Sequence, residues 1–141
     1  VAIRGMIEQG HGHIYNMEGF GSNGRMRLGL SLYGSTKSAV RFLSRSLTKE
    51  TADTPAKVST ISPGMVITEF VTDQYKDDPE GLEEAKKIFN VIADKVETVT
   101  PWLVEKMLAN EKSGASIEWL TPMKIMKRFA TARFSKRDLF S

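Results

Sequence analysis

One long stretch of the chain has the hydrophobic period of an amphipathic helix. From residue 31 to residue 54 the apolar side chains recur every three to four positions; they are Leu32, Ala39, Val40, Leu43 and Leu47. Three cationic residues, Arg41, Arg45 and Lys49, fall on another side of the same helix. The pattern predicts a helix over residues 31–54, which Pro55 ends because proline cannot continue a helical hydrogen-bond ladder.

Two short apolar runs flank this helix and predict strands. Residues 13–17 (HIYNM) follow a glycine-containing break at residues 10–12, and residues 57–62 (KVSTIS) stop at Pro63 and Gly64. A strand, a helix of about twenty residues and a second strand form a right-handed crossover, which places the two strands in parallel. The chain is therefore expected to be α/β, with residues 1–141 belonging to a single domain.

The remaining segments are predicted from the same patterns. Residues 1–9 read as the end of a helix. An acidic stretch follows residue 68, and residues 73–84 of it read as a solvated loop. Helical periods follow at residues 85–93 and 96–109, then a short strand at residues 115–120. Pro122 opens a basic terminal helix, since proline is tolerated in the first turn of a helix.

Composition narrows the class of protein. The chain has 141 residues, 40% of them hydrophobic, no cysteine and a formal charge of +3, which is typical of a globular protein. No apolar run approaches the roughly 20 residues of a transmembrane helix. Disulfides and thiolate metal sites are excluded, and the small charge without interleaved aromatic and basic residues argues against nucleic-acid binding.

Residues 19–24 (GFGSNG) match the pattern G-x-G-x-x-G after a predicted strand. In a dinucleotide-binding fingerprint the third glycine opens a helix, and an acidic residue ends the next strand. Here the helix begins at about residue 31, and the next strand ends in Ser62-Pro63-Gly64. We therefore interpret these glycines as a loop that permits a close approach of the backbone, and not as a phosphate site.

Tyr33 and Lys37 form the candidate catalytic pair. Side chains at i and i+4 of a helix share one face, and an ammonium beside a phenol favours the phenolate, which would lower the tyrosine pKa from about 10. Such a pair is often only solvated helix surface. The context favours function, because Ser22 and the segment from Pro63 to Thr68 each follow the carboxyl end of a predicted parallel strand, where ligands bind.

A metal site is not expected. His11 and His13, with Glu8 or Glu18, lack a convincing third ligand, and a turn that leads into a strand explains the two histidines better.

The ordered set of motifs resembles the short-chain dehydrogenase/reductase family. Its active-site serine, its Y-x-x-x-K and its P-G-x-x-x-T segment are matched by Ser22, by residues 33–37 and by residues 63–68. The resemblance implies an NAD(P)-dependent exchange of hydride between the cofactor and a carbonyl or alcohol. Tyr33 would be the acid/base, Lys37 would lower its pKa and hold the nicotinamide ribose, and Ser22 would bond the substrate oxygen. The remaining cofactor-binding positions would be Pro63, Gly64, Val66 and Thr68.

The segments GHIYNMEGFGS, LYGSTK, SPGMVITE, ETVTPWLV and WLTP are more narrowly similar to plant and algal chlorophyll b reductases and their bacterial relatives. This implies a bulky apolar carbonyl substrate, such as the formyl group of chlorophyll b, and NADPH in preference to NADH. The sequence departs from the family where Glu18-Gly19 replaces the usual serine pair. The fold implied is the second half of a doubly wound Rossmann-type sheet, and the phosphate-binding half is expected upstream of Val1, so this chain alone should bind cofactor poorly.

The sequence is compatible with more than one binding partner and more than one cellular compartment. The basic terminal helix is expected either to lie on an anionic membrane surface or to dock on the rest of the domain or on a sister subunit. We expect a homo-oligomer, located in the cytoplasm or, in a photosynthetic eukaryote, in the plastid stroma or at the thylakoid surface. A different class of function is a non-catalytic remnant that serves as a dimerisation or regulatory module through the helix at residues 31–54.

Overall fold

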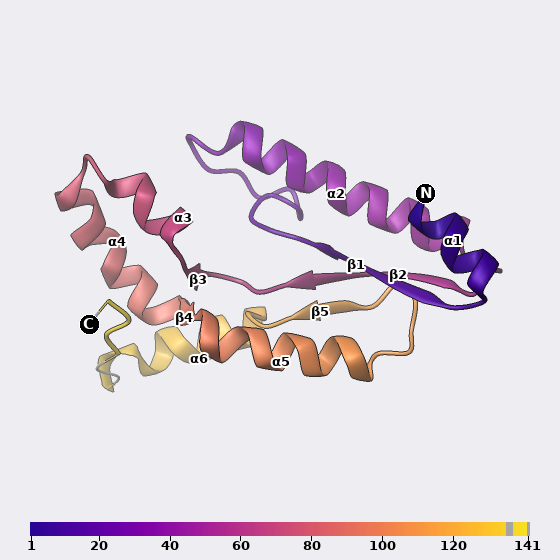
Figure 1. The fold of residues 1–141 in the computed structure, drawn as a ribbon. Helices are drawn as coiled ribbons and strands as arrows, with labels where there is room; N and C mark the ends of the chain where they lie inside the picture. Colours follow the sequence, from indigo (N-terminus) through magenta and orange to yellow (C-terminus); the bar gives the residue numbers. More distant parts are fainter. Residues whose placement is uncertain (135–136, 141) are drawn as a thin grey trace. The chain divides into compact units, whose positions relative to one another are not determined.

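The computed structural model describes residues 1–134 and 137–140, apart from the side chain of Phe70. Figure 1 shows the elements, which are α1 (Ala2–Gln9), β1 (Gly12–Met17), α2 (Ser31–Glu50), β2 (Ala56–Ser62), β3 (Val66–Ile67), α3 (Glu69–Thr72), the 3-10 helix η1 (Asp73–Tyr75), α4 (Pro79–Ile92), β4 (Asp94–Lys95), α5 (Val96–Ala109), β5 (Ser116–Glu118), α6 (Pro122–Thr131) and the 3-10 helix η2 (Ala132–Phe134). They form two compact units. The first unit holds residues 1–62 and 105–117, and the second holds residues 63–104 and 118–141.

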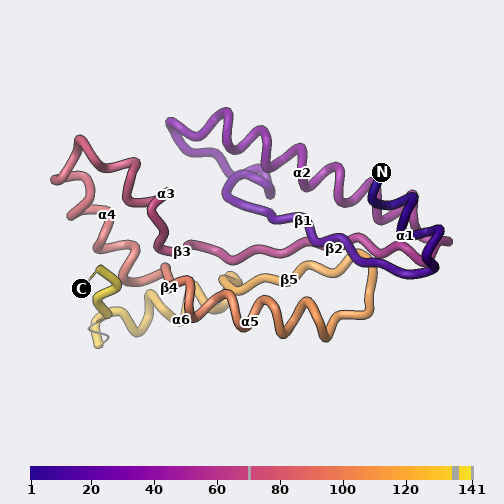
Figure 2. Tube along the Cα trace, in the orientation of Figure 1, coloured from indigo at the N-terminus to yellow at the C-terminus, as the bar shows by residue number. Residues whose placement is uncertain are grey.

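The first unit is built on a sheet with the strand order β1-β2-β5. β1 and β2 are parallel, and their register runs from Gly12 opposite Ala56 to Met17 opposite Ile61. The trace in Figure 2 shows these two strands side by side, joined through α2. The predicted strand, helix, strand crossover is confirmed. β2 is the most buried strand, and Val58 has no exposed surface.

Both faces of β1 are covered within this unit. The side chain of Asn16 donates a hydrogen bond of 2.9 Å to the Ser44 hydroxyl of α2. On the opposite face the Tyr15 hydroxyl donates to the backbone oxygen of Met107, at 2.8 Å, near the end of α5. Successive side chains of a strand point to opposite faces, so β1 lies between helices, as in a doubly wound sheet.

α2 ends at Glu50, four positions before the predicted end at residue 54. The Thr51 hydroxyl donates back to the backbone oxygen of Leu47, at 2.8 Å. The next residues form a turn in which the Thr54 nitrogen donates to the Thr51 oxygen. Threonine hydroxyls compete for backbone groups in this way and favour helix ends over helix interiors.

The second unit combines helices with a two-stranded parallel pair. β3 pairs with β4 through Val66 opposite Asp94 and Ile67 opposite Lys95. The expectation of a loop over residues 73–84 is wrong, because this stretch holds η1 and the first turns of α4. α4 begins at Pro79, where the Asp78 side chain caps the helix by accepting a hydrogen bond from the Gly81 nitrogen, at 2.9 Å.

A buried carboxylate ties the second unit together. Asp94, which is 5% exposed, accepts hydrogen bonds from the guanidinium groups of Arg128 and Arg137 and from the Trp119 indole. The same two arginines also donate to backbone oxygens of residues 91–93. A buried charge is tolerated only when it is paired and fully hydrogen-bonded, so this network anchors the C-terminal segment to the end of α4.

Candidate active site

The loop after β1 lies close to the ends of the Tyr33 and Lys37 side chains. A Cβ atom placed on Gly19 would lie 2.5 Å from the Tyr33 hydroxyl oxygen and 3.1 Å from Cε of Lys37. Both side chains of the predicted pair therefore reach the same point on the backbone, two residues beyond the end of β1. Only a glycine leaves room for them there, since real Cβ atoms do not approach other atoms so closely.

Lys37 is fixed at the carboxyl end of β1. Its ammonium donates a hydrogen bond of 3.2 Å to the backbone oxygen of Met17, the last residue of the strand. The same nitrogen lies 5.7 Å from the centroid of the Tyr33 ring. The structure thus brings the tyrosine and the lysine together, at the edge of a parallel sheet where ligand sites form.

A contact between two glycines holds the loop against α2. Gly21 has a φ of +93°, and a Cβ on it would lie 2.6 Å from the Cα of Gly34. The Ser38 hydroxyl donates to the Gly21 backbone oxygen at 2.7 Å. Gly21, which belongs to the rejected phosphate motif, therefore permits a close approach of two backbones. This agrees with the interpretation of the loop from the sequence.

Ser22 faces a buried carboxylate. Its hydroxyl donates to Oε2 of Glu18 at 3.1 Å, and Arg41 forms an ion pair with the same oxygen at 3.0 Å. Glu18 is only 7% exposed. A serine hydroxyl has one proton to donate, so Ser22 has to release Glu18 before it can donate to a substrate oxygen.

Sequence reasoning missed the part that Glu18 and Arg41 play. From the sequence, Glu18 reads as a departure from the family pattern or as a rejected metal ligand, and Arg41 reads as part of a cationic helix face. The available signal was their chemistry: an acid directly after a buried strand and a base on the following helix form a pair when the helix crosses back over that strand end. Their pairing fixes the loop that carries Gly19, Gly21 and Ser22.

The four predicted cofactor-binding residues after β2 lie in the second unit. Val66 belongs to β3, and Thr68 is the extended residue before α3, whose backbone oxygen accepts from the Val71 nitrogen at 2.9 Å. Gly64 has a φ of +72°, and any Cβ on it would run into Leu120. Pro63 and Gly64 therefore form a turn that needs glycine for its conformation and for its space.

His13 lies within the first unit as part of a polar network. It shares hydrogen bonds with Ser59, at 2.9 Å, and with Tyr15, at 3.1 Å. Burial, and then repulsion from Lys57, lowers the pKa of His13 below 6.5. Among residues 1–134 and 137–140 no group of three or more His, Cys, Asp or Glu side chains is placed to hold a metal ion.

The donors at the end of β1 fit one part of a dinucleotide. Lys37 and Tyr33 offer an ammonium and a phenol side by side, which suits a ribose hydroxyl and a carbonyl oxygen. A phosphate cradle is absent from the Gly19–Gly24 loop, because α2 begins only at Ser31 and its N-terminus lies too far along the chain. The end of β1 and the facing turn of α2 thus offer hydrogen-bond donors but no phosphate cradle.

Comparisons with known proteins give the family. The family model described as short chain dehydrogenase matches residues 1–79. The chloroplastic probable chlorophyll(ide) b reductases of Oryza sativa subsp. japonica and Arabidopsis thaliana are 38% and 36% identical over 89% and 86% of this chain. The chain spans only 24% and 23% of those two proteins. An uncharacterized oxidoreductase of Staphylococcus aureus is 37% identical over 60% of this chain, which spans 38% of it.

Solved structures agree in fold. The closed form of a serine dehydrogenase complexed with NADP⁺ aligns with a TM-score of 0.66 and 28% identity, over 86% of this chain and 48% of that protein. An L-sorbose reductase from Gluconobacter frateurii, complexed with NADPH and L-sorbose, has a TM-score of 0.64 at 19% identity, over 82% of this chain and 48% of that one. The α/β fold and the family resemblance are both confirmed, and the chain belongs to the short-chain dehydrogenase family.

Proposed function

We propose that the protein is an NAD(P)-dependent oxidoreductase that interconverts a carbonyl and an alcohol. The observation that carries this proposal is the meeting of the Tyr33 hydroxyl and the Lys37 side chain above Gly19, at the end of β1. A solvated surface pair would have no reason to contact the loop backbone at a point where a Cβ atom would displace the side chains.

The geometry suits the proton side of such a reaction. The cofactor supplies the hydride to the carbonyl carbon, and negative charge grows on the carbonyl oxygen as this happens. Tyr33 donates its phenolic proton to that oxygen, which yields the alcohol. The Lys37 ammonium stabilises the phenolate that remains, so the pair favours the transition state over the ground state. In the oxidative direction each of these transfers runs in reverse.

Ser22 is proposed as the second hydrogen-bond donor to the substrate oxygen. Rotation about its Cα–Cβ bond moves the hydroxyl from Glu18 to another acceptor, and Arg41 keeps the Glu18 carboxylate paired meanwhile. Lys37 is proposed to hold the nicotinamide ribose, while Thr68 and the backbone of residues 63–66 line the nicotinamide. NADPH is the proposed cofactor, which agrees with the NADP(H) complexes among the solved relatives.

The proposed substrate is a bulky apolar carbonyl compound, and specifically the formyl group of chlorophyll b. The support is the identity of 34–38% with three chlorophyll(ide) b reductases named as chloroplastic. These three relatives also support a plastid location if the source is a photosynthetic eukaryote, and otherwise we propose the cytoplasm.

The test is turnover by the full-length gene product. Chlorophyll b and simpler aldehydes are offered with NADPH or NADH, and the loss of reduced nucleotide is followed. Activity with chlorophyll b supports the finer proposal, whereas activity with other carbonyls alone supports only the general reaction. Absence of turnover with every carbonyl and both nucleotides would contradict both.

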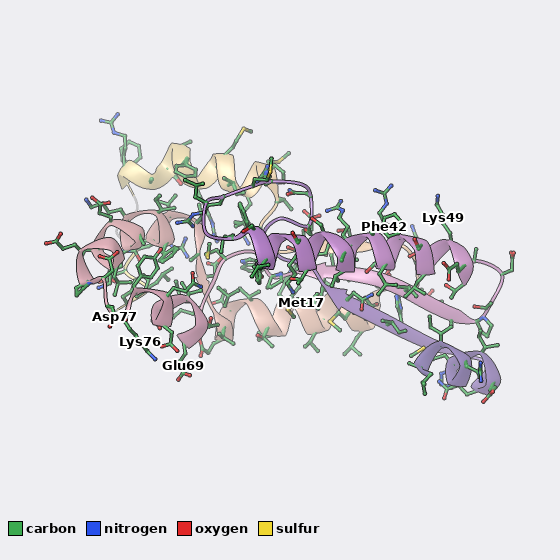
Figure 3. All side chains as sticks on the ribbon, turned by 90° about the horizontal axis from the view of Figure 1, so that it is seen from above. Met17, Phe42, Lys49, Glu69, Lys76 and Asp77 are labelled. Carbon is green, nitrogen blue, oxygen red and sulfur yellow. The ribbon has the colours of Figure 1, made fainter. Side chains whose placement is uncertain are left out.

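A second candidate function is a non-catalytic module that joins two subunits through α2. Leu32, Phe42 and Leu43 are 85%, 75% and 52% exposed along this helix, and Figure 3 shows Phe42 projecting away from the ribbon. The same surface supports the proposal that the enzyme is a homo-oligomer. Light scattering on the parent protein and on a Leu43→Asp variant tests self-association through α2. A monomeric parent would refute it, and a dimeric parent with a monomeric variant would support it.

A peripheral membrane contact is proposed for α6. Lys124 lies over the Trp119 ring and Arg128 bonds to Asp94, so these two cations point into the unit. The exposed side instead carries Met123, Met126 and Phe129 together with Lys127, which suits an interfacial helix. No helix among the described residues is long and apolar enough to cross a membrane. Failure of the full-length protein to sediment with anionic vesicles would rule this contact out.

A further inference from the structure

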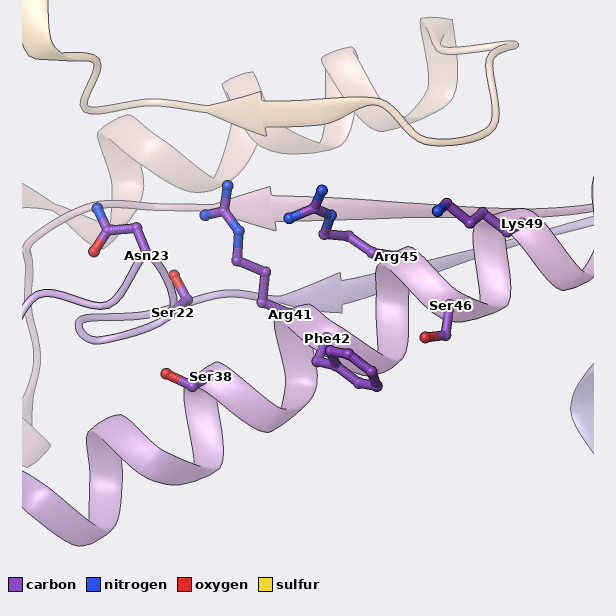
Figure 4. Close-up of a pocket in the computed structure, with 8 residues that line it drawn as sticks. All are labelled: Ser22, Asn23, Ser38, Arg41, Phe42, Arg45, Ser46 and Lys49. Atoms are coloured by element: carbon purple, nitrogen blue, oxygen red, sulfur yellow. The ribbon is translucent and has the colours of Figure 1, made fainter.

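A partner subunit would cover the cavity beside α2 that Figure 4 shows, because its lining includes Phe42, which belongs to the helix surface proposed above to join two subunits. Another cavity, of about 470 Å³, lies wholly within the second unit. It is formed where α4 and α6 meet near β4 (Figure 1), and we call it the α4–α6 cavity. The charged and amide side chains that line it are Lys87, Asn90, Asp94, Arg128 and Arg137.

The α4–α6 cavity carries an excess of positive charge. Three cations, Lys87, Arg128 and Arg137, and one carboxylate, Asp94, leave a charge of +2 on its lining. The C-terminal ends of α4 and α6 each contribute a partial negative charge of roughly half a unit. Even when both are counted in full, about one positive charge remains. The cavity therefore favours a ligand with a single anionic group.

The two guanidinium groups are held in place and still have donors to offer. Arg128 makes three hydrogen bonds and Arg137 makes three, all of them to Asp94 and to backbone oxygens of residues 91–93. A guanidinium has five N–H donors, so in the described part of the chain two remain on each arginine. The side chains are 18% and 30% exposed, which leaves them open to a ligand. Because both are already ordered, binding costs little side-chain entropy.

α4 supplies donors from the opposite wall. Lys87 is exposed, and no acidic group among residues 1–134 and 137–140 forms an ion pair with it. The amide oxygen of Asn90 accepts a hydrogen bond of 3.0 Å from the Leu139 nitrogen, so its NH₂ group is the end left to donate. Lys87 and Asn90 are three positions apart and share one face of the helix. An anion in the cavity therefore meets donors from α4 as well as from the two arginines.

We propose that the α4–α6 cavity binds a small organic molecule that carries one phosphate or carboxylate group. Charge-assisted hydrogen bonds from guanidinium and ammonium groups to such anions are among the stronger hydrogen bonds in proteins. The cavity, at about 470 Å³, is roomier than a bare anion requires and has the size of a small-molecule site. Val91 and Ala132 add short apolar walls for the rest of the ligand.

The ligand is proposed to be free in solution and not a lipid headgroup. Arg128 lies two positions after Met126, which is about 200° around a helix. The cavity is therefore on the side of α6 away from the exposed methionine that is proposed above to contact a membrane. None of Ser22, Tyr33 and Lys37 lines it, so the inference does not rest on the proposed reaction.

The experiment titrates the full-length gene product with glycerol phosphate and with benzoate in a calorimeter, which requires no turnover. The test variant is Lys87→Glu, which places a carboxylate beside the ligand. The matched control is Lys95→Glu, which makes the same charge change at an exposed position of the second unit outside the cavity. Circular dichroism establishes that both variants are folded. A second measurement follows the labelling of lysine amines in the parent protein by mass spectrometry, with and without the probe.

We expect saturable binding of at least one probe by the parent, and binding at least about tenfold weaker by Lys87→Glu. Lys95→Glu should bind like the parent. The bound probe should slow the labelling of Lys87 and leave that of Lys95 unchanged. This combination of results would support the proposal.

Four outcomes would overturn the proposal. The parent could show no saturable binding of either probe. Lys87→Glu could bind like the parent, which would place the anion elsewhere, or both variants could weaken equally, which would show a diffuse charge effect. Finally, the parent could bind neither probe yet sediment with vesicles that contain phosphatidic acid, and lose this binding in Lys87→Glu alone. The ligand would then be a lipid headgroup.

Discussion

Gly19 decides how close Tyr33 and Lys37 come to the end of β1. The sequence motif alone places the tyrosine and the lysine on one helix face, but it does not show what lies beneath them. The structure places the Gly19 backbone there, with no room for a side chain. The absence of a Cβ atom is thus part of the candidate active site.

Replacing Gly19 by alanine is expected to displace the Tyr33 hydroxyl. The new methyl group would occupy the position 2.5 Å from that oxygen, and an error of about 1 Å in a reacting group costs on the order of 100-fold in rate. Turnover by the full-length enzyme should fall accordingly. Gly5→Ala is the control, because that position is helical with open space around it. Unchanged turnover in Gly19→Ala would mean that the hydroxyl is not poised at this point.

Glu18 is expected to stabilise the fold through its charge. Glu18→Gln keeps the shape of the side chain but leaves Arg41 without its anion, at a site where Glu18 is 7% exposed. The free energy of unfolding should fall by about 1 to 3 kcal/mol, as measured by urea denaturation. Glu83→Gln, in an exposed pair with Lys86, should change it by less than about 0.5 kcal/mol. Equal effects of the two variants would contradict the role given to Glu18.

His13 makes stability depend on pH. Its pKa in the folded state is lowered, first by burial and then by Lys57, so the unfolded chain takes up the proton at a higher pH than the folded chain does. This contribution to stability is complete above pH 6.5, the ordinary value, and is lost as the pH falls below it. The urea midpoint should therefore drop more steeply in the parent than in His13→Gln between pH 7.5 and 5.5. Parallel curves would refute this.

At the scale of elements, the long periodic segments were predictable and the short ones were not. β1, α2 and β2 follow from hydrophobic spacing that extends over several residues, and the turn signals at Pro55 and Pro63 mark where they stop. β3 and β4 have two residues each, which is too few for any period to appear. These two strands form because the tertiary fold brings Val66 opposite Asp94 in a parallel pair.

The first turns of α4 were missed although their signal was present. Asp78 followed by Pro79 is an N-cap and first-turn pair, but the surrounding acids suggested a solvated loop. Asp78→Ala should lower the free energy of unfolding of this unit by about 1 kcal/mol. Asp77→Ala, which removes the neighbouring exposed acid, should leave it nearly unchanged. Hydrogen exchange in the first turn of α4 is the local measurement, and equal protection in the two variants would contradict the cap.

At the scale of the whole molecule, family and fold were readable from the order of the motifs. Ser22, the Tyr33–Lys37 pair and the Pro63–Thr68 segment appear in the sequence in the family's order, and the family match confirmed what that order indicated. The Ser22–Glu18–Arg41 arrangement was not readable, since it depends on how α2 crosses back over the end of β1.

The chain belongs to the short-chain dehydrogenase family and spans 48% of two solved relatives. In the mechanism proposed above, the phenol of Tyr33 acts only beside a bound nicotinamide cofactor. In the same proposal, Lys37 acts through this phenol by its charge, and Gly19 acts through it by the space that it leaves. All other parts of the proposed mechanism depend on this one hydroxyl.

The most direct measurement compares turnover of the full-length protein and its Tyr33→Phe variant, with NADPH and a carbonyl that the parent reduces. Loss of the phenolic proton should lower kcat by at least about 100-fold, while binding of NADPH changes little. Tyr15→Phe, which removes a hydroxyl bonded to Met107 on the other face of β1, should retain turnover if it stays folded. A Tyr33→Phe variant that turns over like the parent would contradict the central claim.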